Sequence, residues 1–154
     1  MGLDMYLSKK YYIGNKYRKP EQRIKVVVPK NQADASSPVS GIHTKKISEI
    51  TEEAAYWRKA NAIHKWFVDN IQGGEDDCRE YYVPREQLQE LVDICDKIIA
   101  NHDLAPKLLP TQVGFFFGGD EYDEYYFGTL KETKKMLVEA LKNEDGNFYY
   151  QSSW

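Results

Sequence analysis

Residues 51–71, TEEAAYWRKANAIHKWFVDNI, constrain the fold of this chain most, because they are typical of one long amphipathic helix. At about 100° per residue, one stripe of this helix is apolar: Tyr56, Ala60, Ile63, Phe67 and Ile71. The stripe beside it carries two hydrogen-bonding side chains: Trp57, Asn61, His64 and Val68. Trp66 lies on the opposite side. We therefore expect another part of the protein to cover its indole.

Two further helices follow in the sequence. Residues 85–101 place their apolar side chains within one arc, and Pro84 suits the first helical position. Asp120 is predicted to cap the third helix, with Asp123 three residues later as in a capping box. Its inward stripe consists of Tyr126, Leu130, Thr133, Leu137 and Leu141.

The strands are expected at both ends of the chain. Residues 2–8 alternate apolar and polar side chains, the period of a half-buried strand. The β-branched run at 24–28 predicts a second strand that ends at Pro29, and a short strand is expected just before Pro84. The terminal run 147–154 is expected to pair with one of the first two strands, because its backbone groups need partners. The sequence thus predicts an α+β fold of three helices packed on a small sheet built from N-terminal strands and the C-terminal strand.

The length of 154 residues fits a single globular domain over residues 1–154 with one core. Residues 29–47 are rich in Ser, Pro, Ala and Gly, and they predict a long flexible loop, either a lid or a disordered segment. No apolar run approaches the ~20 residues that cross a bilayer, and the first residues lack the pattern of a secretory signal. We expect a cytoplasmic protein with no membrane partner.

Charge and cysteine content limit the partners and cofactors that we expect. The net charge of −3 gives no global attraction to nucleic acid, so no long nucleic acid is expected as a partner without a local basic patch. Cys78 and Cys95 are predicted to be reduced thiols, with Cys95 on an apolar helix stripe. The acidic groups 75–77 and 120–124 have no adjacent His and no metal-ligand spacing, so no metal or other cofactor is predicted.

The candidate binding site is a polar set on the 51–71 helix: Trp57, Arg58, Asn61 and His64. Arg provides a planar fork for phosphate, Asn and His provide directional hydrogen bonds, and Trp provides a stacking face, a combination that suits a nucleotide. Phe117 and Tyr122 are candidates for further stacking surface. In the structural alternative, Asn61 and His64 bond to neighbouring loops and Arg58 pairs with a carboxylate. No catalytic residue is predicted, because no motif surrounds the one nucleophile pairing considered, Cys78 with His64.

Five sequence blocks, in order, resemble a family of small proteins encoded by tailed bacteriophages and prophages. The blocks are GLDMYL at 2–7, YWRKANAIHKWF at 56–67, DC at 77–78, LPTQVGFFFG at 109–118 and EYDEYY at 121–126. The likeness covers nearly the whole chain apart from 29–47. It implies a phage accessory protein in the cytoplasm of an infected bacterial host, and it supplies no catalytic residues.

Three functions are compatible with this reading. The leading hypothesis is a non-catalytic sponge that sequesters a small anionic, nucleotide-derived immune signal, so that the protein acts in anti-defence. The second is a protein-binding inhibitor of a host factor through an exposed aromatic surface that includes Trp66, a face that could instead mediate homo-oligomerisation. The third is an enzyme that cleaves a nucleotide signal with His64 as general base near Asp4 or Asp77. It ranks lowest, because no residue spacing supports it.

Overall fold

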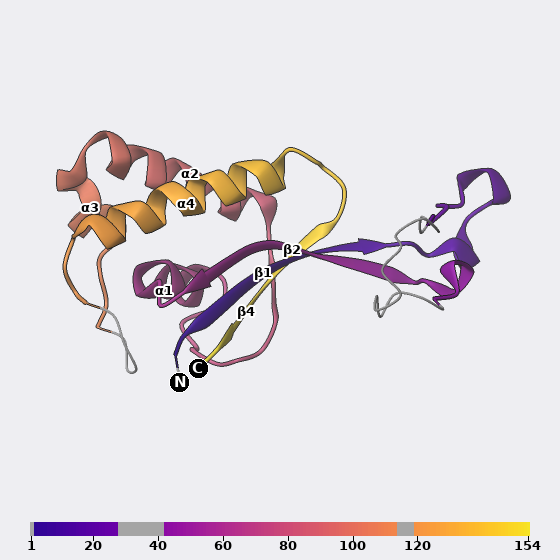
Figure 1. Ribbon diagram of the computed structural model, residues 1–154, viewed down its shortest axis with the longest axis horizontal. Coiled ribbons are helices and arrows are strands. Elements are labelled where there is room, and N and C mark those ends of the chain that lie inside the picture. Colours follow the sequence, from indigo (N-terminus) through magenta and orange to yellow (C-terminus); the bar gives the residue numbers. More distant parts are fainter. Residues whose placement is uncertain (1, 28–41, 114–118) are drawn as a thin grey trace, which may run out of the picture.

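The computed structural model describes residues 2–27, 42–113 and 119–154, and its α+β class confirms the prediction (Figure 1). The strands and helices, in chain order, are β1 Asp4–Tyr12, β2 Glu49–Arg58, α1 Asn61–Asn70, β3 Tyr81–Val83, α2 Arg85–Ala100, α3 Ala105–Leu108, α4 Glu124–Leu141 and β4 Asn147–Ser153. Short 3-10 turns lie at η1 Asn15–Tyr17, η2 Pro20–Gln22, η3 Thr44–Lys46 and η4 His102–Leu104. The described residues thus contain four α-helices, where the sequence predicted three.

The four strands form one antiparallel sheet in the order β2-β1-β4-β3. β1 therefore occupies a central position, and the strand that its alternation predicted over 2–8 is present from Asp4 onward. The expected pairing of the C-terminal strand is confirmed, because β4 pairs with β1 from Asp4 opposite Ser153 to Lys10 opposite Asn147. The N- and C-termini lie close together, because β1 begins where β4 ends (Figure 1).

The predicted helix over 51–71 is wrong in its first half. Residues 49–58 form β2, and the helix begins only at Asn61. Within β2, Ala55 and Trp57 are buried, whereas Tyr56 and Arg58 are exposed. Buried and exposed side chains therefore alternate as in a strand, but the same apolar residues also fit the spacing of a helix. Pairing with β1 satisfies the backbone of these residues and decides between the two structures.

The predicted strand over 24–28 is also wrong in its described part. Residues 24–27 form no strand, and Val27 is 69% exposed. Both edges of β1 are already occupied, by β2 and β4, so this β-branched run has no free partner there. The side chain of Asn15 instead bonds to the backbone N–H and C=O of Ile24, at 2.8 and 2.6 Å. Val28 and most of the predicted loop, residues 29–41, lie outside the described residues.

Helices α2 and α4 pack against each other and cover one face of the sheet together with α1 (Figure 1). The short strand β3 and the helix over 85–100 match the sequence prediction, with Pro84 one residue before the helix as its N-cap. Asp123 caps α4, not Asp120: its carboxylate accepts the backbone N–H of Tyr126 at 2.9 Å. Among the described residues, no helix is both long and apolar enough to span a membrane.

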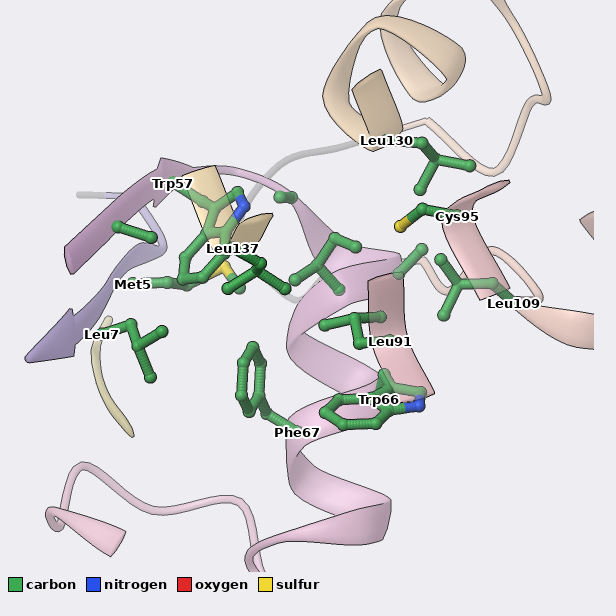
Figure 2. Packing of buried hydrophobic residues seen from close by; sticks show 14 of the residues in the cluster. Met5, Leu7, Trp57, Trp66, Phe67, Leu91, Cys95, Leu109, Leu130 and Leu137 are labelled. Carbon is green, nitrogen blue, oxygen red and sulfur yellow. The ribbon is translucent and has the colours of Figure 1, made fainter. Parts of the chain in front are cut away.

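The core lies between the sheet and the helices, where aromatic and aliphatic side chains interlock (Figure 2). Phe67 on α1 is its centre: its ring stacks on Tyr150 at 4.0 Å and meets Trp57 at 5.8 Å. Trp66 is only 5% exposed and packs edge-on against Phe67. The expectation that its indole is covered is confirmed. The hypothesis of a docking surface that includes Trp66 is therefore wrong, because the indole is buried.

Candidate functional site

A pocket of about 220 Å³ opens where the end of β2, the first turn of α1 and the start of α4 meet. Its apolar floor consists of Ala60, Ala62, Ile63 and Leu130. Its polar rim includes Lys59, Asn61, Thr111, Glu121, Asp123 and Tyr125. An apolar floor with a few polar groups at the rim is the usual composition of a small-molecule site.

The chain turns sharply from β2 into α1 beside this pocket. Lys59 adopts φ 56°, the left-handed region that non-glycine residues rarely occupy, while its backbone N–H donates to Leu3 at 2.8 Å. Ala60 then stands at the N-cap position and provides no side-chain cap. Within the described part of the chain, the backbone N–H groups of Ala62 and Ile63 donate no hydrogen bond. Such N–H groups, with the helix dipole, favour a negatively charged group at this end of the pocket.

Three hydroxyl groups of pocket-lining residues donate hydrogen bonds to backbone carbonyls. Tyr125 donates to the carbonyl of Arg58 at 2.8 Å and so ties α4 to the end of β2. Tyr126 donates to the carbonyl of Leu109 at 2.6 Å, and burial raises the pKa of this phenol, which stays a neutral donor. Thr111 donates to the carbonyl of Asp120 at 2.9 Å. These bonds fix the shape of the pocket before any ligand arrives.

Asn61 is the only described residue of the predicted binding set that lines the pocket. Tyr122 contacts two residues that line the pocket. Its hydroxyl accepts the backbone N–H of Thr111 at 3.3 Å, and its ring packs edge-on against the ring of Tyr126 at a centroid distance of 5.1 Å. Phe117 lies outside the described residues.

Trp57 lies in the core rather than at the pocket. It is 4% exposed, and its indole N–H donates to the hydroxyl of Thr133 on α4 at 2.8 Å. The bond joins β2 to α4, and the buried ring has no exposed face on which a ligand could stack.

The side chain of Arg58 extends into solvent. Its Nε lies 3.8 Å from a carboxylate oxygen of Asp4, which also accepts the hydroxyl of Tyr56 at 2.5 Å. This arrangement matches the structural alternative for Arg58, although such an exposed pair contributes little to stability. Arg58 does not line the pocket, but its backbone carbonyl accepts the hydroxyl of Tyr125, which does.

His64 also follows the structural alternative. The imidazole is 8% exposed, with Nδ1 2.7 Å from the hydroxyl of Tyr150 and Nε2 3.0 Å from the carboxylate of Asp76. An ionised Asp76 can only accept, so Nε2 carries a proton, and in the neutral imidazole Nδ1 then accepts from the hydroxyl of Tyr150. Burial, and secondarily Asp76, raises the pKa of Tyr150. The chain of bonds joins α1, the 75–80 segment and β4.

Neither carboxylate considered as a partner of His64 bonds to it. Asp4 bonds to Tyr56, and Asp77 accepts from the backbone and Nε of Arg79 and from the hydroxyl of Tyr81. Cys95 is buried as predicted, which raises its pKa to about 12, whereas Cys78 is exposed.

Sequence reasoning missed Lys59, Thr111, Glu121 and Tyr125 as pocket residues. Their proximity depends on the true start of α1, which the sequence placed ten residues too early. The left-handed conformation of Lys59 has no sequence signal, because glycine or asparagine is the usual choice there. Tyr125 lies one position before the inward stripe of α4 and could have been identified from its place in the first turn.

Groups of three His, Cys, Asp or Glu side chains arranged to hold a metal ion do not occur among residues 2–27, 42–113 and 119–154. Comparisons with family models, curated proteins and solved structures find no match for this chain.

Proposed function

We propose that this protein binds a small anionic, nucleotide-type ligand in the pocket at the start of α1 and holds it without turnover. The observation that carries this proposal is a preformed pocket of about 220 Å³ in which a helix start, a lysine and a set of polar acceptors converge. The phage setting and the sequestration of an immune signal rest on the sequence resemblance alone and form the wider part of the proposal.

The lining of the pocket combines two chemically different groups of residues. In the first group, Lys59 and the first-turn N–H groups of α1 suit a phosphate. In the second group, Thr111, Gln112 and Glu121 offer oxygens that can accept a hydrogen bond from the exocyclic amine of a base. Because Glu121 and Asp123 are anionic, a bare phosphate is a poorer ligand than one joined to a hydrogen-bond donor.

The volume limits the ligand. Sites for drug-sized molecules measure about 300–1,000 Å³, so this smaller pocket accepts one nucleotide unit. A cyclic dinucleotide would leave its second base outside. We therefore propose a mononucleotide or ADP-ribose-like signal, with a single nucleotide moiety inserted.

Binding rather than cleavage is supported by the location of His64. The side chain we considered as a general base faces Tyr150 and Asp76, and both of its ring nitrogens are engaged there. It does not line the pocket.

Thermal shift against cyclic mononucleotides, cyclic dinucleotides and ADP-ribose isomers tests the proposal, with adenosine as the uncharged control. A ligand at 100 times its Kd adds about 2.7 kcal/mol, which corresponds to a rise of roughly 5–10 °C for a domain of this size. Adenosine should give a much smaller shift. No shift with any member of the panel removes the proposal.

Lys59→Gly separates the roles of this residue. Glycine accepts the left-handed backbone at no steric cost, so the variant should keep the turn into α1 while losing the cation. We expect ligand affinity to fall roughly ten-fold or more, from loss of ~1.5–3 kcal/mol of charge-assisted bonding. Arg58→Lys is the control one residue away, and it should leave both affinity and melting temperature unchanged because that side chain is exposed and does not line the pocket.

A further inference from the structure

The charge of this protein is divided between two regions. The far ends of β1 and β2 extend into a projection that we call the basic arm, residues 13–27 and 42–48. The basic arm contains seven Lys or Arg residues and one Glu, a net charge of +6. Its cations are Lys16, Arg18, Lys19, Arg23, Lys25, Lys45 and Lys46. Because the whole chain carries −3, all other residues together carry −9.

The basic arm stands away from the helices. In Figure 1 it projects beyond the body of the sheet, at the end of the indigo and magenta strands. Ile13 anchors it: the side chain is 3% exposed and its backbone N–H donates to Ser48 at 2.8 Å. Beyond Ile13, no residue that the structure describes in the basic arm is buried.

The cations of the basic arm do little for the fold. None of them forms an ion pair with any residue of the described ranges, whereas cations of the body, such as Lys10 and Arg79, do. Arg18 donates from Nε to the carbonyl of Ile13 at 2.8 Å, the one side-chain bond of these cations to the described backbone. Seven like charges held together repel one another, so this arrangement costs stability unless an anionic partner is bound.

Aromatic rings accompany these charges. Tyr17 is 79% exposed between Lys16 and Arg18, and Tyr12 is 60% exposed at the base of the basic arm. Further exposed rings lie on the open face of the sheet, away from the basic arm: Tyr56 is 39% and Tyr82 54% exposed. Cations for phosphates and exposed rings for bases are the two components of single-strand recognition. An acidic protein surface would need the cations and would leave Tyr17 unexplained.

We infer that the basic arm binds single-stranded nucleic acid, with its Lys and Arg side chains on the phosphates and a base stacked on Tyr17. The net charge of −3 conceals this site, because it averages the basic arm with an acidic body. The inference stands apart from the pocket, whose ligand is a single nucleotide unit.

Fluorescence anisotropy with labelled oligothymidylate, measured across a salt series, tests the inference. The slope of log K against log salt is about −0.7 per phosphate contact on a single strand. Lys19→Gln/Arg23→Gln/Lys25→Gln should therefore make the slope shallower by about 2 and weaken binding at low salt. The control Lys97→Gln/Lys131→Gln/Lys135→Gln removes the same charge from exposed, unpaired lysines of α2 and α4, and should not weaken binding.

Two substitutions of Tyr17 test the proposed stacking contact. Tyr17→Ala should weaken binding by roughly ten-fold, since one stacked base contributes on that order. Tyr17→Phe keeps the ring and should bind as the wild type does. Lys59→Gly should also bind the oligonucleotide normally, which distinguishes failure of this inference from failure of the pocket proposal.

Several outcomes would overturn the inference. These are a wild-type protein that does not bind oligothymidylate at low salt, equal weakening by both triple variants, or tighter binding to a duplex of the same length. Polyglutamate that competes as well as oligonucleotide, with Tyr17→Ala unchanged, would assign the basic arm to an acidic protein instead. The salt dependence of the wild type decides the electrostatic part even if a variant folds poorly.

Discussion

Tyr150→Phe tests whether the bond between His64 and Tyr150 is a structural element of the core. The change removes one hydroxyl and keeps the ring, so the stack on Phe67 at 4.0 Å is preserved. The hydroxyl lies 2.7 Å from Nδ1 of His64, in a region where Tyr150 is 0% and His64 8% exposed. Water cannot replace the lost donor, so Nδ1 is left buried without a partner.

An unsatisfied buried acceptor costs about 1–3 kcal/mol. We expect a loss of ~2 kcal/mol in the free energy of unfolding, or roughly 4–8 °C in Tm for a domain of this size. Urea denaturation followed by tryptophan fluorescence measures it. Tyr149→Phe is the matched control: it is the preceding residue of β4, its hydroxyl makes no hydrogen bond among the described residues, and its loss should change stability by less than ~0.5 kcal/mol.

A double-mutant cycle with His64→Leu isolates the pair. Residues in direct contact show coupling energies of about 0.5–3 kcal/mol. Coupling near zero, or equal effects of Tyr150→Phe and Tyr149→Phe, would refute the structural role of this bond. Ligand binding in the folded fraction of Tyr150→Phe should be unchanged, because neither side chain of the pair lines the pocket.

Three further predictions concern stability. Trp66→Ala should destabilise the fold by about 3–5 kcal/mol in denaturant titration, because it removes a buried indole from the core. Lys9→Met should cost about 1–3 kcal/mol by the same measurement, since the Lys9 ammonium donates to the carbonyls of Ala140 and Asn143 at the end of α4. Burial acts to raise the pKa of Asp77, but hydrogen bonds from Arg79 and Tyr81 outweigh it and hold the value below the ordinary 3.8. Stability from Asp77 is therefore present above that pH and lost below it, so Tm should fall less steeply with acid in Asp77→Asn than in wild type.

Local patterns predicted much of the fold correctly. The alternation of residues 2–8 and the apolar arc of residues 85–101 each fit one kind of element, and both appear as β1 and α2. The C-terminal run needed only the argument that its backbone requires partners. These segments carry their structural information within a single short window of sequence.

The errors occur where long-range pairing decides the structure. Residues 51–58 fit both a helix and a strand, and the partner that selects the strand lies about 50 residues away in β1. At residues 24–27 the reverse holds: β-branched side chains favour a strand, but both edges of β1 are taken. The predicted binding site depended on the helix expected over residues 51–58, so it is affected by the first of these errors. Trp57 and Arg58 belong to a strand with alternating faces, so one side chain enters the core and the other enters solvent.

The same pairing explains why the two proposed binding regions lie at opposite ends of one hairpin. β1 and β2 pair from Asp4 opposite Arg58 to Tyr12 opposite Glu49. At the first end, β2 must turn back through the left-handed Lys59 into α1, which creates the pocket. At the second, the strands run past the helices into the basic arm, whose cations form no ion pair with any residue that the structure describes. A register shift lies between them, at Leu7 and Ser8. Because a bulge increases the local twist of a strand pair, we expect this shift to influence the direction in which the basic arm projects. Changes that straighten it should alter nucleic-acid binding and leave the pocket intact.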